Sequence, residues 1–227
     1  VLPDNVPSNE FLNLKGLKFS TSRGVAVWIH EFVESFPADY LRYALAKVLP
    51  ETKDSDFDWR GVQAAINNEL ADTLGNFVNR SFTFAKKHFD GAVPELKEPN
   101  AMDREMLSDL QSYPERIAHH LEQYRFRDAV DEMMGLARQG NKYFNDSAPW
   151  STRKTDVAQC GNTIHVSLQI CASLAVMFEP LLPFSAARLR GMLGLTGVRS
   201  SESGGDAGSI GWFDAGQPLL TAGTELG

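Results

Sequence analysis

The sequence predicts a mainly α-helical protein whose body is a helix bundle. Apolar residues recur at steps of three or four through most of residues 25–193, and no convincing alternation of strand, turn and strand occurs in residues 55–193. With 227 residues and 43% hydrophobic composition, the chain is long enough to bury a core. Its formal net charge of −7 argues against general electrostatic coating of nucleic acid or of an anionic membrane. Any contact with nucleic acid therefore has to be local.

The helical periods and the positions of proline and glycine define the individual elements. Residues 1–24 are rich in Pro, Asn, Gly and Lys and are expected to be extended or loop structure. The strongest periodic signal predicts one long helix that Asp90 and Gly91 end. Asp103 is the expected N-cap region of the helix that follows, and Pro114 is a point of kinking or restart. The expected helices cover residues 26–36, 40–49, about 59–88, from 103 onward, about 126–148, about 157–178 and 183–193.

The last 34 residues differ in composition from the bundle. Nine of the 18 glycines lie there, and helical periodicity is almost lost. We expect a linker or an irregular wrap whose apolar pairs, at residues 212–213 and 219–220, dock on the helices.

The two cysteines and the apolar runs indicate a cellular compartment. Cys160 and Cys171 are eleven residues apart on one predicted helix, roughly 16 Å, which is too far for a disulfide, so both are expected to be buried, reduced thiols. No apolar run approaches the ~20 residues of a membrane span, and the N-terminus does not resemble a signal peptide. We therefore expect a cytoplasmic protein without membrane association. Because the chain begins at Val1 and has no closing element, we also expect a piece of a longer protein.

The usual catalytic motifs are missing from the sequence. It has no nucleophile elbow, no GxxxxGK phosphate loop, no HExxH and no paired cysteine spacing for zinc. His119 and His120 are neighbours on a helix and point about 100° apart, so they are expected on a solvated face and not around a metal. Neither a self-contained active site nor a metal site is predicted.

Residues 18–24 form a polar loop just before a helix. This segment contains two cations, three hydroxyls and a glycine, which is a composition that can follow and neutralise a polyphosphate. The alternative is an ordinary polar loop.

A second polar pattern lies on the predicted long helix. Asn76, Arg80, Thr83 and Lys87 follow the helical repeat and form one polar stripe beside the apolar stripe. Such donors can meet the edges of splayed RNA bases, and Trp150, after a proline at a helix boundary, could provide a stacking platform. The alternative is that the stripe is a solvated face, with Trp150 packed against the bundle and Arg80 paired with a surface acid.

Several segments together resemble one enzyme family. Residues 18–22 (KFSTS) resemble the KMSKS loop of class I aminoacyl-tRNA synthetases, and the segments that follow match methionyl-tRNA synthetases in order and spacing. The matching segments are ADYLRY at 38–43, LGNFVNR at 74–80, FDG at 89–91, NKYF at 141–144 and APW at 148–150. The resemblance to the methionyl-tRNA synthetase family covers roughly residues 9–190.

The resemblance implies a role in ATP chemistry for the loop. In this family the loop closes over ATP while methionine is adenylated, so Lys18, Ser20 and Ser22 are the implied catalytic residues, and Lys18 with Thr21 would contact ATP, used as Mg-ATP. Phe19 replaces the methionine of the motif. Thr21 replaces its second lysine, which removes one positive charge and leaves a hydroxyl donor.

The resemblance also implies recognition of tRNA(Met). Asn76, Arg80 and Trp150 occupy the positions that recognise the CAU anticodon, especially its first base. Phosphate contacts around the anticodon stem are expected from Lys86, Lys87, His88, Arg138, Lys142, Arg153 and Lys154.

The expected organisation has three parts. Residues 1–53 would be the C-terminal end of a catalytic domain, 54–193 an α-helical anticodon-binding domain and 194–227 a Gly/Ser-rich tail or linker. The HIGH half of the active site and the zinc-bearing insertion have no counterpart, so this piece alone is expected to be inactive. A missing N-terminal catalytic domain is the expected partner, and a C-terminal extension or a homodimer is left open.

Two alternatives remain at this point. The first is the anticodon domain of another class I synthetase, of the leucine, isoleucine, valine or cysteine type. The second is a non-catalytic α-helical RNA-binding module, against which the loop at 18–24 argues.

Overall fold

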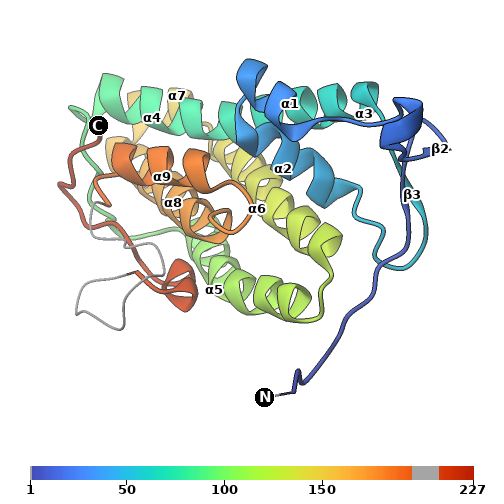
Figure 1. Cartoon of the computed structure of the whole chain (residues 1–227). Helices are drawn as coiled ribbons and strands as arrows, with labels where there is room; N and C mark the ends of the chain where they lie inside the picture. The colour runs from blue at the N-terminus through green and yellow to red at the C-terminus, as the bar shows by residue number, and fades with distance from the viewer. Residues whose placement is uncertain (1, 196–209) are drawn as a thin grey trace.

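The computed structural model describes residues 2–195 and 210–227 and shows a mainly α-helical chain, as predicted (Figure 1). The α-helices are α1 (Ile29–Ser35), α2 (Ala38–Lys47), α3 (Trp59–Ala64), α4 (Asn76–His88), α5 (Ala101–Glu122), α6 (Phe126–Ser147), α7 (Pro149–Thr155), α8 (Val157–Met177) and α9 (Pro183–Met192). A π-helix, η2 (Ala65–Gly75), joins α3 to α4, and two 3-10 helices are η1 (Thr21–Arg23) and η3 (Trp212–Gly216). The strands are β1 (Leu12–Leu14), β2 (Leu17–Lys18) and β3 (Ser55–Phe57).

Helix α8 is the centre of the bundle. It contacts α4, α5, α6, α7, α9 and η3, and every residue from Cys160 to Met177 is buried. By length and composition α8 could cross a membrane, but its apolar 18-residue window is buried within the protein, as the core helix of a bundle is. Both cysteines on α8 are buried free thiols, as predicted, and burial raises the pKa of Cys171 to about 12.

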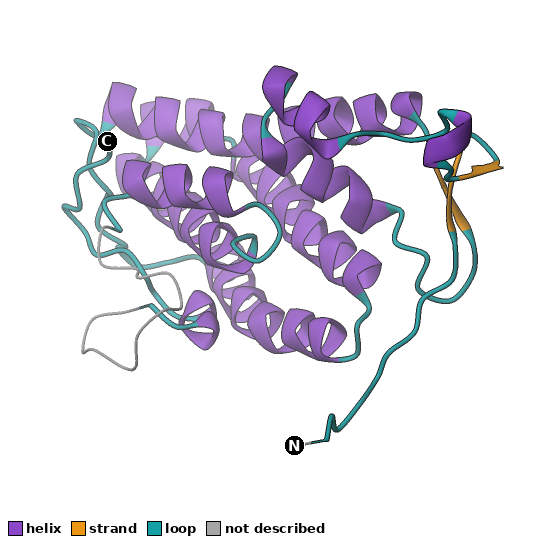
Figure 2. Cartoon of the chain, viewed as in Figure 1, coloured by secondary structure: helices purple, strands orange, loops and turns teal. Residues whose placement is uncertain are grey.

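A small three-stranded sheet lies at one end of the molecule (Figure 2). Strand β1 pairs antiparallel with β2 and parallel with β3. The sequence predicts extended or loop structure in residues 1–24, where β1 and β2 lie. It predicts no alternation of strand, turn and strand in residues 55–193, and the single strand β3 is missed because three residues carry too little alternation to be recognised. A second, smaller core lies beside the sheet, formed by Phe32, Leu41, Ala44, Phe57 and Val62.

The predicted long helix is continuous in space but not uniform. Residues 65–75 are π-helical, and the Thr73 hydroxyl donates to the Asn68 carbonyl five residues earlier (2.8 Å). Asn141 on α6 donates to the Thr73 carbonyl (2.8 Å). At the end of the π-helix a Cβ on Gly75 would lie 3.0 Å from the Leu70 carbonyl oxygen, so only glycine fits without adjustment. The π-helical segment is therefore held by a hydrogen bond from Asn141 on α6.

Helix α5 begins earlier than predicted. Asn100 is the N-cap, and its side chain accepts from the Asp103 backbone in a capping box. Asp103 is instead fully buried, where its carboxylate accepts from the Tyr143 hydroxyl (2.6 Å) and from Gln159 Nε2 (2.9 Å). Pro114 lies inside the helix, which continues through it to Glu122.

The described part of the C-terminal tail wraps around the bundle, as predicted, with Trp212, Leu219 and Leu220 packed against the core, whereas Phe213 of the first expected pair is 64% exposed. Trp212 Nε1 donates to the Pro114 carbonyl (2.8 Å). Gln169 on α8 accepts from the backbone N–H groups of Leu219 (2.9 Å) and Leu220 (3.1 Å). The final residue reaches α9, where Gly227 N donates to the Met192 carbonyl (2.8 Å). Residues 196–209 of the predicted linker lie outside the described residues.

Helix α2 joins the N-terminal part to the bundle through two opposite charges. The buried Asp39 carboxylate accepts from the backbone of Ser185 in the first turn of α9 (2.7 Å). The Arg42 guanidinium donates to the carbonyls of Leu181 (2.9 Å) and Pro180 (2.8 Å) just after α8. A carboxylate at a helix N-terminus and a cation near a helix C-terminus are both favourable.

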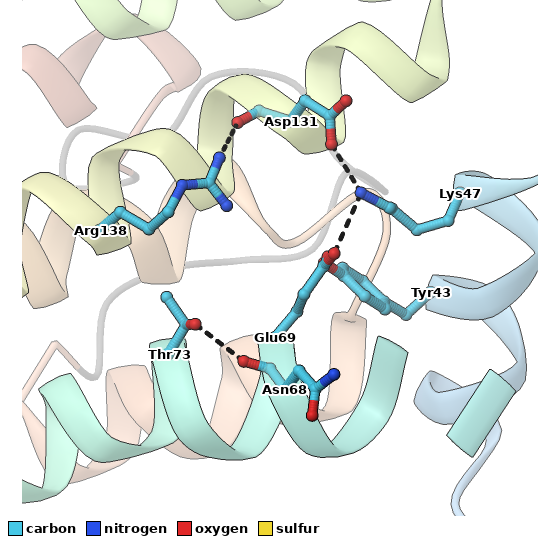
Figure 3. Close-up of polar contacts among 7 residues, drawn as sticks. All are labelled: Tyr43, Lys47, Asn68, Glu69, Thr73, Asp131 and Arg138. Carbon is cyan, nitrogen blue, oxygen red and sulfur yellow. Dashed lines mark hydrogen bonds and ion pairs between the residues drawn. The ribbon is translucent and has the colours of Figure 1, made fainter. Parts of the chain in front are cut away.

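A second set of polar contacts joins α2 to η2 and α6 (Figure 3). The Tyr43 hydroxyl donates to Glu69 on η2. Lys47 Nζ lies 2.6 Å from Asp131 Oδ1 on α6 and 3.3 Å from Glu69 Oε1. These contacts fix α2 against the two elements that lead to the polar stripe on α4.

Candidate nucleic-acid interface

The polar stripe predicted on the long helix lies on α4 and is accessible. Asn76, Thr83 and Lys87 are exposed, and Arg80 is half-buried. The Arg80 guanidinium carbon is 4.5 Å from the centroid of the Phe144 ring, and Nη2 donates to Asn145 Oδ1 (2.6 Å). Within the described residues no carboxylate lies within 4.0 Å of this guanidinium, so Arg80 is not paired with a surface acid.

Arg80 is therefore held in one place, and among residues 2–195 and 210–227 most of its donors have no acceptor. A guanidinium has five N–H donors, and the bond to Asn145 uses one. Partial burial lowers the pKa of Arg80 from its ordinary value, but an arginine stays charged in proteins.

Trp150 reaches the same surface from a sharp turn between two helices. Helix α6 ends at Ser147, Ala148 adopts a left-handed conformation (φ 42°), and Pro149 begins α7. A left-handed non-glycine residue is uncommon and often marks a functional site. Trp150 is 49% exposed, and its ring centroid lies 6.4 Å from that of Phe144. The ring is thus not a buried cap of the bundle but a half-open aromatic face.

Phe144 connects the stripe to the tryptophan. It is buried, and it contacts Arg80, Trp150 and Phe84. Phe84 meets it edge-on, with ring centroids 6.1 Å apart and an interplanar angle of 82°. Arg80 and Trp150 come from segments seventy residues apart, so the shared aromatic neighbour is what places a donor group beside a stacking face.

The predicted phosphate loop is an ordered turn at the other end of the molecule. Ser20 and Val25 exchange two backbone hydrogen bonds (2.8 and 2.9 Å) around η1. The hydroxyls of Ser20 and Ser22 lie 3.3 Å apart, and Thr21 is exposed. Lys18 ends β2, with its Nζ 5.2 Å from the Phe11 ring centroid.

The loop and the stripe are two separate sites. In Figure 1 the β2 end of the molecule and the end that contains α7 lie on opposite sides of the bundle. Neither site shows a metal-binding set, and within the described residues no three His, Cys, Asp or Glu side chains gather in a group that could hold a metal ion. His119 is exposed at the end of α5, whereas His120 is only partly so.

Comparison with known protein families decides the identity of this arrangement. The family "tRNA synthetases class I (M)" matches residues 1–82, which include the loop, Asn76 and Arg80. The family "Anticodon binding domain of methionyl tRNA ligase" matches residues 93–217, which include Trp150. This chain belongs to the methionyl-tRNA ligase family.

Curated methionyl-tRNA ligases match the chain over its whole length. A methionine–tRNA ligase of Salinibacter ruber is 56% identical and covers 100% of this chain, which corresponds to 32% of that protein. A methionine–tRNA ligase of Bacteroides fragilis is 47% identical, again over 100% of this chain and 32% of that protein. The chain therefore spans about a third of the length of these relatives.

Solved structures of methionyl-tRNA synthetases have the same fold. A Mycobacterium tuberculosis methionyl-tRNA synthetase in complex with methionyl-adenylate is 27% identical with a TM-score of 0.83, covering 96% of this chain and 42% of that chain. The apo form of the M. tuberculosis enzyme is 25% identical with a TM-score of 0.82, covering 100% of this chain and 42% of that chain.

The cations that are expected to bind RNA phosphates divide into those without and those with a partner among the described residues. Lys87, Arg153 and Lys154 are exposed. Within the described residues their side chains form no hydrogen bond or ion pair. The other expected cations have partners within the protein: Lys86 Nζ donates to the Gly227 carbonyl (2.9 Å), and Lys142 pairs with Asp146.

Arg138 lies at a different place from the rest. It donates to the Asp131 carbonyl (3.3 Å) at the junction with α2 (Figure 3). The sequence could not show this, because Arg138 and Lys142 lie on the same predicted helix and only the packing of α6 separates their surroundings.

Sequence reasoning missed the neighbours that hold the two main residues. Asn145 and Phe144 position Arg80, and neither belongs to the stripe on α4. The available signal was their place next to the APW segment, in the same family-like stretch as Trp150.

Proposed function

We propose that this chain is the part of a methionine–tRNA ligase that reads the CAU anticodon of tRNA(Met) and supplies the ATP loop. The observation that carries the proposal is the fixed guanidinium of Arg80, stacked on Phe144 beside the half-exposed ring of Trp150. The full ligase would use ATP to join methionine to its tRNA in the cytoplasm.

A fixed guanidinium beside an aromatic face suits an unpaired cytosine. The face of Trp150 stacks on the splayed base, and the free N–H groups of Arg80 donate to acceptors on its Watson–Crick edge. Uracil carries an N–H donor at its N3 position where cytosine has an acceptor, so it would leave an Arg80 donor opposed to another donor. A site built to hydrogen-bond one base rejects the other by about 1–3 kcal/mol. Asn76 is exposed one turn before Arg80, and its side-chain amide offers a further hydrogen-bonding group to the same base.

The loop at 18–22 would bind the phosphates of ATP during methionine adenylation. In that reaction the methionine carboxylate attacks the α-phosphorus of ATP, and pyrophosphate leaves. Lys18 supplies positive charge, Ser20 and Ser22 supply hydroxyl donors, and Thr21 supplies a hydroxyl where the family motif has a lysine. Because the chain has no counterpart of the HIGH motif, we expect no adenylation from it alone.

We propose that residues 1–53 belong to the catalytic part, 54–193 to the anticodon-binding domain and 194–227 to the tail. Packing does not stop at residue 53, since the small core beside the sheet includes Phe57 and Val62. The two parts are therefore expected to move as one body.

The test is binding of RNA stem-loops to the chain with Arg80 intact or replaced. Arg80→Ala is expected to weaken binding of a CAU loop by about 10- to 100-fold and to reduce the preference for CAU over a loop changed only at its first base. The control is Arg60→Ala, an exposed arginine on α3. Equal weakening of both loops by Arg80→Ala would show that Arg80 does not read a base. Tighter binding of a leucine, isoleucine, valine or cysteine anticodon would assign the chain to another synthetase.

A further inference from the structure

A second aromatic surface lies beside the one formed by Arg80 and Trp150. Phe84 and His88 are one turn apart on α4, with ring centroids 4.5 Å apart and an interplanar angle of 60°. Phe84 is also in edge contact with Phe144. The ring contacts therefore run in the order Trp150, Phe144, Phe84 and His88, and the buried Phe144 joins the exposed Trp150 to the half-buried rings of Phe84 and His88.

The His88 ring packs against Phe84 at the C-terminal end of α4. Within the described residues its imidazole makes no hydrogen bond or ion pair, although it is partly buried against Phe84. The charged groups that act on the His88 ring are both cations, Lys87 on the same helix and Arg153 on α7. Partial burial and these two cations lower the pKa of His88, which favours the neutral form of the ring.

Lys87 and Arg153 complete the surroundings of this ring. Both side chains are exposed, and within the described residues neither has a hydrogen-bonding partner or an ion-pair partner. Their neighbour Lys86, in contrast, is bound to the Gly227 carbonyl. Arg153 lies one helical turn after Trp150 on α7, and its charge also acts on His88, so it lies near both aromatic surfaces.

We propose that Phe84 and His88 form a second base-stacking site, which holds another unpaired base of the same RNA loop while Lys87 and Arg153 neutralise the phosphates beside it. This inference rests on the proposed function and deepens it. A neutral aromatic ring stacks on any base, so this site adds affinity and not discrimination. Its effect is thereby separable from that of Arg80.

The test uses three variants of the chain, whose binding to fluorescently labelled stem-loops is measured at fixed salt. His88→Gln keeps a polar side chain but removes the ring, and it is expected to weaken binding about tenfold, equally for the CAU loop and for the loop changed at its first base. His88→Phe keeps a ring and is expected to bind like the wild type. His30→Gln, the same change at an exposed histidine on α1, is the control and is expected to have no effect.

A set of loops with one abasic nucleotide identifies the stacked base. In the wild type, removing that base is expected to weaken binding about tenfold, and in His88→Gln the same removal is expected to cost almost nothing. The inference is wrong if His88→Gln binds the stem-loops like the wild type, or if His88→Phe binds them as weakly as His88→Gln. It is also wrong if removing any one base weakens binding to His88→Gln as much as it weakens binding to the wild type. If any of these results is found while the wild type still prefers the CAU loop, only the second stacking site is overturned. If the wild type itself does not distinguish the two loops, the proposed function is overturned.

Discussion

Gly140 sets how closely α6 approaches α4, and Gly140→Ala tests this contact. A Cβ on Gly140 would lie 2.6 Å from Phe77 Cζ and 2.9 Å from Cε1 and Cε2. Carbon atoms in contact prefer a separation of about 3.5–4.0 Å. Phe77 is fully buried in the main core, so its ring has no space into which to withdraw. The substitution therefore has to push the two helices apart by about 1 Å, the shortfall from that separation.

The expected cost follows from two opposing effects. Overpacking a core by a methyl group typically costs about 1–3 kcal/mol, and replacing a mid-helix glycine by alanine returns about 1 kcal/mol. Gly135, on the same helix, provides the matched control, because a Cβ there meets nothing within 4 Å. Gly135→Ala is thus expected to stabilise the chain by up to about 1 kcal/mol. The two identical substitutions should differ by about 1–3 kcal/mol in the free energy of unfolding.

Urea unfolding followed by far-UV circular dichroism measures this difference, provided that the slope with denaturant is the same for all three proteins. Because α4 carries Arg80 and α6 carries Asn145, Gly140→Ala should also weaken RNA binding. If Gly140→Ala is as stable as Gly135→Ala, the Phe77 contact does not set the distance between these helices and the reasoning is refuted.

Three further predictions follow from single side chains. Gln169→Leu leaves the buried backbone groups of Leu220 without partners, so hydrogen exchange at that amide should become at least about tenfold faster, while unchanged exchange would show that the tail does not depend on this contact. Burial lowers the pKa of His165, whose Nδ1 donates to the Pro94 carbonyl (2.8 Å), so the folded state binds a proton less readily than the unfolded state. Stability should then be full above the unfolded-state pKa of about 6.5 and fall as the pH drops below it, with a smaller fall in His165→Gln when unfolding is measured at pH 7.5 and 5.5. Lys87→Ala should weaken binding of all stem-loops alike and reduce the slope of log affinity against log salt by about 1, and a change in first-base preference would contradict a phosphate role.

The long helices were predictable because each buries a continuous apolar stripe. Helix α8 is the clearest case, since its apolar and small residues continue through the centre of the bundle. The π-helical turn at 65–75 was not predictable, because it depends on Asn141, which α6 brings to the Thr73 carbonyl. The short helix α7 was also missed, since its segment PWSTRKT has no apolar repeat, although Pro149 does mark a helix boundary in the sequence.

The candidate site was predictable in its main residues but not in its supports. Arg80 and Trp150 follow from the spacing of the stripe and from resemblance to a family. That Arg80 is stacked on Phe144 and bonded to Asn145 depends on how α6 crosses α4, and this contact joins residues 65 positions apart. The fate of the surface cations was equally hidden, since Lys86 and Lys87 are neighbours and only one of them is bound to the C-terminal residue.

The most direct measurement of the central claim is binding of the chain to a CAU anticodon stem-loop and to one changed only at its first base. We expect the wild type to bind the CAU loop more tightly and Trp150→Ala to lose this preference. Trp28→Ala is the matched control and should keep the preference, because Trp28, the N-cap of α1, is 47% exposed and Trp150 is 49% exposed. Equal, salt-sensitive binding of both loops by the wild type, or a preference that survives in Trp150→Ala, would contradict anticodon reading at this surface.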